Sequence, residues 1–490
     1  MSIKIYNSQT QQKEPFKPLE EGKVKMYCCG PTVYDFLHVG NFRGAVFYNF
    51  ARNWLEKIGY EVTYAYNFTD VDDKILKRAS DEGVTAKEIA ERYIKEFWVD
   101  FNALNLSPHT FNPKVTDHMD DIISLIEDII AKDRANEVEG EVFYSIENFK
   151  DYGKLSHRKP EDMQSGARIE VDPKKRNPLD FTLWKPAKEG EQSWTSPWGE
   201  GRPGWHIECS AMTRALLGEQ IDIHGGGMDL IFPHHENEIA QSEGASDKNY
   251  VGCWMHNNMF TFSGAKMSKS LGNIRTMRSF LEKFNGEIFK YLVLSVHYRS
   301  EADFSDATIQ NSVAALGRIY SALNKAKIYG NGDTKLKTPE TDKMREQIEK
   351  ANKAITDFFN DDFATPQAMA QIFDTVRLYN QLVPAGAKKK GPAATISQLF
   401  YDFLTTTGEP LALFQEEPQA FLTLLDDMLL EEKNLNREKS DEMVEKRIIA
   451  RKDKNFEESD RLRDELNALG IDIRDGAEGT TWEVRKGQSQ

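Results

Sequence analysis

A strand, a tight turn and a helix follow one another near the N-terminus, and this succession limits the fold more than any other feature. Apolar and polar residues alternate over Val24–Cys28, Gly30-Pro31 breaks the pattern, and a helical pattern starts at His38. At the helix start of such a βα unit, unpaired backbone N–H groups face a bound phosphate. Gly40 would let a phosphate approach closely, and His38 and Asn41 can both donate hydrogen bonds to it. We therefore interpret the segment as an ATP-phosphate cradle; the alternative is a helix-start histidine in a surface turn.

A second predicted strand completes a βαβ order. Val62–Phe68 follows the helix after a break at Gly59, and Thr69 comes at its carboxyl end. Open parallel sheets bind ligands at this edge, so we expect Thr69 at the mouth of the pocket. Asp72 and Asp73 come next and belong either to the same pocket or to a helix start, where acidic side chains are favoured.

Length and hydropathy indicate a globular protein of several domains. The 490 residues correspond to three or four domains of about 100–200 residues each. The mean hydropathy is −0.60, and no apolar run reaches the roughly 18 residues that a membrane span needs. The first residues lack the charged-then-apolar order of a signal peptide. We therefore expect a cytoplasmic protein that binds no membrane.

Cysteine content and charge narrow the chemistry. Four cysteines do not make a disulfide framework in such a chain, so reduced thiols, buried or metal-bound, are expected. The net charge of −15 argues mildly against a nucleic-acid partner, because phosphate contacts require a local excess of Lys and Arg. Residues 433–454 nevertheless hold eight basic and five acidic side chains. A local basic strip is therefore compatible with the acidic chain.

The pattern of predicted secondary structure changes three times after the first βαβ unit. Residues 137–198 show short polar strands interrupted by prolines, which indicates an insertion between two halves of a nucleotide-binding fold. From residue 303 the pattern is helical, with a helix start at Thr365-Pro366. The last unit begins near Asp426 and predicts two helices within 443–469 and one or two strands within 471–484.

Several residues of metal-ligand type lie near predicted strand ends and helix starts. Pro233 suits the first turn of a helix in which His234 and Glu238, four residues apart, share a face while His235 points elsewhere. Two thiolates would complete a tetrahedral zinc site with this pair. Because neighbouring strand residues face opposite ways, only one of Cys28 and Cys29 can take part. The alternatives are cysteines that act as small buried apolar residues and a His/Glu pair on the surface.

Two distant strings together resemble a known pair of signatures. His38-Val39-Gly40-Asn41 and Lys266-Met267-Ser268-Lys269-Ser270 resemble those of class I aminoacyl-tRNA synthetases. The strings Cys29–Asp35, Gly204–Ser210 and Phe232–Glu238 resemble those of the cysteinyl-tRNA synthetases in particular, and the resemblance covers nearly the whole chain. One position departs from the pattern, because the first signature most often ends in histidine. Asparagine still donates a hydrogen bond there.

The resemblance implies an α/β fold with several parts. We expect a Rossmann-like catalytic domain with a parallel sheet, split by a connective insertion and followed by an α-helical bundle and a small mixed C-terminal domain. The expected boundaries are 1–115 and 201–260 for the two catalytic halves, 116–200 for the insertion, 261–310 for the Lys266–Ser270 loop and stem-contact region, 311–425 for the tRNA-binding bundle and 426–490 for the anticodon-binding domain.

The resemblance also implies an activity and its residues. The expected reaction is ATP-dependent ligation of L-cysteine to the 3′ end of tRNA(Cys) through a cysteinyl adenylate, by a monomer that uses ATP with Mg²⁺ and one Zn²⁺ per subunit. Zinc would prefer the thiolate of cysteine to the hydroxyl of serine, which apolar contacts separate by only about 1–3 kcal/mol. The implied residues are His38, Asn41, Lys266 and Lys269 for catalysis, His38, Gly40, Asn41 and Lys269 for ATP, Gly30, Thr69 and Trp205 for cysteine, Cys29, Cys209, His234 and Glu238 for zinc, and Arg451, Asp460, Asp475 and Trp482 for the anticodon. Cys28 and Cys253 are left as structural cysteines.

Three other functions fit parts of this pattern. A paralogue that ligates cysteine to a small amine would not need the last sixty or so residues. A small-molecule nucleotidyltransferase would lack the strings that carry the presumed zinc ligands. A catalytically inactive RNA-binding paralogue would have no reason to keep Lys266, Lys269 and all four ligands.

Overall fold

The computed structural model describes residues 3–159, 173–188, 191–262, 265–266, 275–476 and 479–486. The chain forms two compact units. The first comprises Met1–Phe280, Val296–Ala302 and Asp357–Thr365, and the second comprises Leu281–Ser295, Asp303–Thr356 and Pro366–Gln490. Within the described residues, no helix combines the length and the apolar character required to span a membrane.

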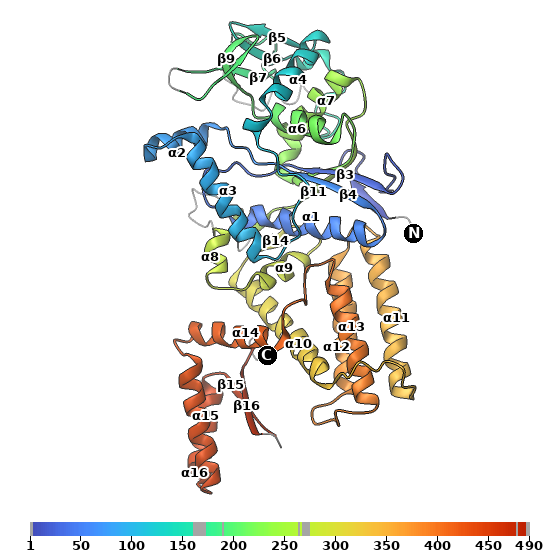
Figure 1. Ribbon diagram of the computed structural model, residues 1–490, viewed down its shortest axis with the longest axis vertical. Helices are drawn as coiled ribbons and strands as arrows, with labels where there is room; N and C mark the ends of the chain where they lie inside the picture. The colour runs from blue at the N-terminus through green and yellow to red at the C-terminus, as the bar shows by residue number, and fades with distance from the viewer. Residues whose placement is uncertain are drawn as a thin grey trace. The chain divides into compact units, whose positions relative to one another are not determined.

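A four-stranded parallel sheet forms the centre of the first unit (Figure 1). Its strands are β3 (Lys23–Cys28), β4 (Glu61–Tyr66), β10 (Ile221–Gly227) and β11 (Val251–Asn257), in the spatial order β11-β10-β3-β4. The chain passes from β3 to β4 on one side and returns later to β10 on the other side. The strand order therefore reverses between β3 and β10, where open parallel sheets bind their ligands. The predicted parallel α/β fold is confirmed.

Helices pack around this sheet, and side-chain caps define where several of them begin. The helices of the first unit are α1 (Val39–Lys57), α2 (Asp73–Glu82), α3 (Ala86–Ala103), α4 (Met119–Ala131), α6 (Ile207–Leu217), α7 (Glu236–Ser246) and α8 (Met277–Leu281, whose last residue opens the second unit). Thr85 and Glu88 form a capping box at the start of α3. The Asp72 carboxylate accepts from the backbone N–H of Lys74 and caps α2. Of the two roles considered for Asp72, the structure thus shows the one at a helix start.

A five-stranded antiparallel sheet is inserted between β4 and β10. Its strands are β5 (Ala135–Val138), β6 (Glu141–Tyr144), β7 (Phe181–Pro186), β8 (Trp194–Ser196) and β9 (Gly199–Pro203), in the order β5-β6-β7-β9-β8. Trp184 and Val142 of this sheet are fully buried in one core with residues of α4, α6 and α7. The short strands predicted for this part of the chain are thus present, but β6 and β7 are largely apolar and buried and not polar as predicted.

The remaining small elements of the first unit connect these layers. They are the hairpin β1 (Lys4–Asn7) and β2 (Gln12–Pro15), the strands β12 (Phe260–Phe262), β13 (Ala265–Lys266) and β14 (Ala302–Asp303, at the unit boundary), and the short turns η1 (Val115–Asp117), η2 (Ile146–Asn148), η3 (Met228–Leu230) and η4 (Ile231–His235). The sequence pattern did not predict the β1–β2 hairpin.

The second unit is mainly helical and ends in a hairpin. Its elements are α9 (Gly286–Leu294), α10 (Asp306–Tyr329), most of α11 (Pro339–Phe359) and α12 (Thr365–Leu382), α13 (Pro392–Gly408), α14 (Pro418–Glu432), α15 (Arg437–Lys452), α16 (Phe456–Ala468), β15 (Ile471–Gly476) and β16 (Gly479–Val484). β15 pairs antiparallel with β16 from Ile471 opposite Val484 to Gly476 opposite Gly479. The helix start at Thr365, the final helix pair and the terminal strands match the sequence-based predictions.

Candidate active site and metal-ligand cluster

The candidate site lies at the carboxyl end of the parallel sheet, where the strand order reverses. Cys29 follows β3 directly, and its backbone N–H donates to the carbonyl of Gly225 in β10, 3.2 Å away. The starts of α6 and α7 bring Cys209, His234 and Glu238 to the same place. A buried sheet edge thus gathers four side chains from three separate parts of the sequence.

Four potential metal ligands meet there. Cys29 Sγ lies 3.5 Å from Cys209 Sγ, 3.5 Å from His234 Nε2 and 3.2 Å from Glu238 Oε1. His234 Nε2 is 3.2 Å from Glu238 Oε1, and one donor atom from each of the four residues lies within 4.8 Å of every other. Tetrahedral zinc, with bonds of about 2.0–2.3 Å, requires ligand atoms about 3.3–3.8 Å apart. The donor set and its spacing therefore fit a zinc ion.

The pKa values of the two thiols shift in opposite directions. The Cys29 thiol donates to Cys209 Sγ, and this hydrogen bond lowers the pKa of Cys209 to about 6. Burial raises the pKa of Cys29, and its contacts with Cys209 and Glu238 add to that shift. Burial opposes protonation of His234, but Cys209 and Glu238 outweigh it and raise the pKa of the ring. The surroundings of Cys209 thus favour the thiolate, the form in which sulfur binds metals.

Two groups on one oxygen hold the Glu238 carboxylate in place. Its Oε2 lies 2.8 Å from His224 Nε2 in β10 and 3.3 Å from the hydroxyl of Tyr250. Oε1 is thereby left facing Cys29 and His234. Partners of this kind fix the orientation of a metal-binding carboxylate. Sequence reasoning missed His224, although a histidine at the end of a predicted strand and directly before three glycines is a usable signal.

The prediction that His235 points away from this cluster is wrong. His235 Nε2 lies 3.9 Å from Glu238 Oε1, and Cys29, His224, His235 and Glu238 form a second group with metal-ligand spacing. The expectation assumed a regular helix from Pro233, whereas α7 begins only at Glu236 and Phe232 has non-helical backbone angles. Burial holds the pKa of His235 far below its ordinary value, and His235 Nδ1 lies 2.8 Å from His256 Nε2. His235 is therefore a neutral neighbour of the four-residue cluster.

Gly30 and Trp205 lie beside the cluster, and Thr69 contacts Glu208, the residue before Cys209. Gly30 follows Cys29, and a Cβ at Gly30 would come within 1.7 Å of the carbonyl oxygen of Asn67, so only glycine fits there. The Thr69 hydroxyl is buried 3.1 Å from Glu208 Oε2. Trp205 is 43% exposed and stacks on the ring of His234 with centroids 4.4 Å apart. An exposed indole over a ligand-type histidine resembles a pocket wall more than a core tryptophan.

The predicted phosphate cradle lies at the start of α1. His38 occupies the N-cap position, and its backbone N–H donates to Asn41 Oδ1 over 3.1 Å. Since its oxygen accepts this bond, Asn41 presents its NH₂ group for donation. Gly40 lies in the first turn. Lys269 is outside the described residues, as is the side chain of Lys266, whose backbone belongs to β13.

The four residues predicted to contact an anticodon lie in or next to α15, α16 and the β15–β16 hairpin. Arg451 and Asp475 form an ion pair, and Arg447 binds both oxygens of Asp475 at 3.0 and 2.9 Å. Hydrogen bonds from Arg447 hold the pKa of Asp475 well below its usual range. Exposed Asp460 lies 3.3 Å from Arg463. These three residues are thus already engaged with charges of the chain itself.

Trp482, the fourth of them, is held from two sides. Its indole Nε1 donates to Asp441 over 2.8 Å, and the guanidinium of Arg437 lies 4.8 Å from the ring centroid. Trp482 is half-buried.

Family models assign the chain to the class I aminoacyl-tRNA synthetases. Residues 15–314 match the model of the class I (C) tRNA synthetase catalytic domain, residues 354–415 match the DALR domain, and residues 438–482 match the cysteinyl-tRNA ligase anticodon-binding domain. A methionyl-tRNA synthetase of Mycobacterium tuberculosis, solved with methionyl-adenylate, shares the fold with a TM-score of 0.63 at 15% identity, over 82% of this chain and 94% of that one.

Relatives specify the family within that class. The chain is 55% identical over 484 residues to a "Cysteine--tRNA ligase" of Bdellovibrio bacteriovorus, which covers 99% of this chain and 100% of the relative. It is 44% identical over 486 residues to that of Syntrophotalea carbinolica, again over 99% and 100% of the two chains. The chain belongs to the cysteine–tRNA ligase family. The resemblance inferred from its motifs is thereby confirmed.

Proposed function

We propose that this protein joins L-cysteine to the 3′ end of tRNA(Cys) in two steps. A carboxylate oxygen of cysteine attacks the α-phosphorus of ATP, the bond to the bridging oxygen breaks, and pyrophosphate leaves. A terminal ribose hydroxyl of the tRNA then attacks the activated carbonyl and releases AMP. The observation that carries the proposal is the cluster of Cys29, Cys209, His234 and Glu238 within 4.8 Å at the carboxyl edge of the sheet that also carries the α1 cradle.

The cluster is proposed to hold one zinc ion that selects cysteine. Such an ion supplies a Lewis acid that binds a thiolate far better than an alcohol. The chain's own contribution is to present thiolate and carboxylate donors in fixed positions, with Glu238 oriented by His224. Trp205 closes one side of the pocket, and Gly30 and Thr69 line the approach of the substrate backbone.

The phosphates of ATP are proposed to lie at the start of α1. His38 and the Asn41 amide donate to phosphate oxygens, and Gly40 allows the close approach. Lys266 and Lys269 are proposed to neutralise the charge that develops on pyrophosphate, and Mg²⁺ to accompany the nucleotide. Phosphoryl-type reactions depend chiefly on positioning and charge neutralisation, so this site requires little acid–base chemistry.

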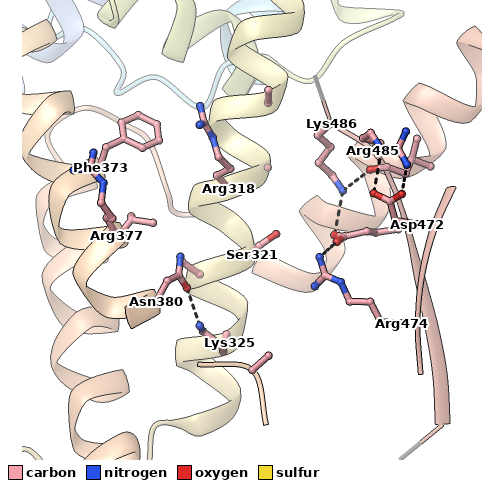
Figure 2. A pocket seen from close by; sticks show the side chains of 17 residues that line it. Arg318, Ser321, Lys325, Phe373, Arg377, Asn380, Asp472, Arg474, Arg485 and Lys486 are labelled. Carbon is pink, nitrogen blue, oxygen red and sulfur yellow. Dashed lines mark hydrogen bonds and ion pairs between the residues drawn. The ribbon is translucent and has the colours of Figure 1, made fainter. Parts of the chain in front are cut away.

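The tRNA is proposed to bind the second unit, and a basic pocket supports this. Helices α10 and α12 and the β15–β16 hairpin surround a pocket of about 740 Å³ (Figure 2). Its lining includes six cationic side chains, those of Arg318, Lys325, Arg377, Arg474, Arg485 and Lys486, against two carboxylates, those of Asp472 and Glu483. In a chain of net charge −15, such a local excess of positive charge suits a phosphate backbone.

Replacing Trp482 by alanine is expected to weaken tRNA binding and leave adenylate formation intact. Base stacking on an aromatic ring contributes about 1–3 kcal/mol, so the Kd should rise about 5- to 150-fold. Filter binding of tRNA(Cys) measures the Kd, and cysteine-dependent ATP–pyrophosphate exchange without tRNA measures the first step. Trp194, which lies in the inserted sheet, provides the control variant Trp194→Ala. Equal Kd values for wild type and Trp482→Ala would remove Trp482 from the anticodon site.

The domain division predicted from the sequence is carried forward as part of the proposal. Residues 1–115 and 201–260 would build the catalytic half-domains around the insertion at 116–200. Residues 261–310 would carry the Lys266–Ser270 loop, and residues 311–425 would bind the tRNA body. Residues 426–490 would bind the anticodon through Arg451, Asp460, Asp475 and Trp482. A cytoplasmic monomer is also proposed, and sedimentation equilibrium at assay concentrations tests the monomer.

Charging of tRNA(Cys) tests the proposed function. Purified protein with zinc, ATP and radiolabelled cysteine should transfer label to tRNA(Cys) and not to a tRNA with another anticodon. Label transferred to a small amine with none to tRNA would identify the amine-ligase paralogue instead. Tight tRNA binding without any adenylate formation would identify an inactive paralogue.

A further inference from the structure

Arg43 is a buried cation on the helix that begins at the proposed phosphate cradle. It lies on α1, five residues after His38, and its side chain is 1% exposed. Burial lowers the pKa of Arg43 to about 10, so the guanidinium remains charged at neutral pH. Burying a charge costs free energy unless hydrogen bonds satisfy it. What Arg43 contacts therefore indicates what the chain gains from it.

The guanidinium of Arg43 joins two separate segments of the chain to α1. Its Nη1 donates to the carbonyl of Met259 at 2.5 Å, and its Nη2 donates to the carbonyls of Ser300 at 2.5 Å and Tyr298 at 3.5 Å. The Phe260 ring lies 5.2 Å from its carbon Cζ. These contacts use the planar, divergent donors of arginine, which a lysine cannot reproduce with one nitrogen.

The segments that Arg43 holds form the base of the strand pair that carries Lys266. Met259 directly precedes β12, and β12 pairs with β13 so that Thr261 lies opposite Lys266. The backbone N–H of Ala302 also donates to the carbonyl of Met259, over 3.3 Å. A displacement of Met259 would therefore be transmitted through β12 to the backbone of Lys266.

The chain returns from this loop to the first turn of the same helix. The N–H of Val39 donates to the carbonyl of Arg275 at 3.0 Å, and the N–H of Met277 donates to the carbonyl of Leu37 at 2.8 Å. His38 and Thr276 form an antiparallel bridge between these bonds. Both ends of the segment that contains the second signature are thus attached to α1, one through backbone bonds beside His38 and the other through Arg43.

We propose that Arg43 is a positioning residue for adenylate formation, which sets the strand carrying Lys266 at its working distance from His38 and Asn41. Arg43 is proposed to contact neither ATP nor cysteine and to act through the backbone that carries His38 and Lys266. Because a misplacement of about 1 Å can cost about 100-fold in rate, loss of this tether reduces turnover rather than cysteine recognition. The inference rests on the proposed roles of His38 and Lys266.

The variant Arg43→Lys, assayed as full-length protein, tests this inference. In cysteine-dependent ATP–pyrophosphate exchange, kcat should fall about 10- to 100-fold while the KM for cysteine stays within about twofold. Zinc content and Tm should remain close to those of wild type. Arg345→Lys is the matched control, because Arg345 in α11 also donates to two backbone carbonyls, those of Thr334 and Leu336, at 2.6 and 2.8 Å.

Chemical rescue separates positioning from a general loss of structure. Methylguanidinium added to Arg43→Ala should restore part of kcat, whereas methylammonium at the same concentration should not. A kcat for Arg43→Lys equal to that of wild type would overturn the inference. So would a fall in kcat accompanied by a matching rise in the KM for cysteine and a loss of zinc. Absence of exchange in the wild-type protein would instead contradict the proposed function itself.

Discussion

Cys29→Ser is expected to lose zinc and to lower cysteine-dependent ATP–pyrophosphate exchange by about 100-fold or more. The Cys29 sulfur lies 3.2–3.5 Å from the donor atoms of the other three proposed ligands, so its replacement removes one of the four proposed coordinating groups. A serine hydroxyl stays protonated near neutral pH and is a poor zinc ligand, and even partners outside the ligand shell contribute about 10- to 100-fold to metal affinity. Zinc per chain by mass spectrometry and exchange at saturating substrates are the two measurements.

The neighbouring cysteine provides the matched control. Cys28 belongs to β3, whereas Cys29 follows it, and successive strand residues face opposite sides. Cys28 is buried, and burial raises the pKa of its thiol well above the ordinary value. Cys28→Ala should keep its zinc and catalyse cysteine-dependent ATP–pyrophosphate exchange at close to the wild-type rate. Equal zinc loss in the two variants would contradict the assignment of Cys29 as the ligand.

His38→Ala is expected to lower the kcat of exchange about 100- to 1,000-fold with its zinc retained. Removing one preorganised donor from a site where charge develops typically costs this much. His38 occupies the N-cap of α1, where the phosphates are proposed to lie. It has no proposed role in binding the cysteine thiol. The KM for cysteine should therefore change by less than about threefold.

A second helix-capping histidine serves as the control for this variant. His118 occupies the N-cap position of α4, and its Nδ1 lies 2.7 Å from the carboxylate of Asp121. His118→Ala removes the same side chain from the same kind of position without touching the cradle. Its exchange should equal that of wild type. Exchange by His38→Ala at the level of His118→Ala would exclude His38 from the phosphate site.

The sequence predicted the local elements well wherever periodicity and caps act together. Thr365-Pro366 marks the start of α12, and the helix begins at Thr365. Such signals depend only on neighbours along the chain. The β1–β2 hairpin was missed because Lys4–Asn7 and Gln12–Pro15 are too short and too exposed to show a clear alternation.

The candidate metal cluster was predicted mainly through the family resemblance. Spacing alone paired His234 with Glu238 but could not choose between Cys28 and Cys29, because which face of a strand meets the pocket is a property of the whole sheet. It also could not find His224, which reaches Glu238 only because β10 lies beside β3. The local error at His235 arose from an irregular turn that replaces the expected helix start.

Charge pairing was the feature least accessible from sequence. Arg451 and Asp475 are 24 residues apart and form an ion pair, so two of the residues predicted to contact the anticodon are partly engaged with each other. The buried Arg43 likewise shows no sequence signal, because its partners are backbone carbonyls at residues 259 and 300. Contacts of this kind follow from tertiary placement and not from residue type.

Selection of cysteine by a bound zinc ion is tested by cysteine-dependent ATP–pyrophosphate exchange without tRNA, with serine and zinc-depleted protein compared in parallel. We expect exchange with cysteine only, its loss when a chelator removes zinc, and its return when zinc is restored. Equal exchange with serine, or exchange with cysteine that persists in protein shown to be free of zinc, would contradict the proposal that this cluster selects the amino acid through a metal ion.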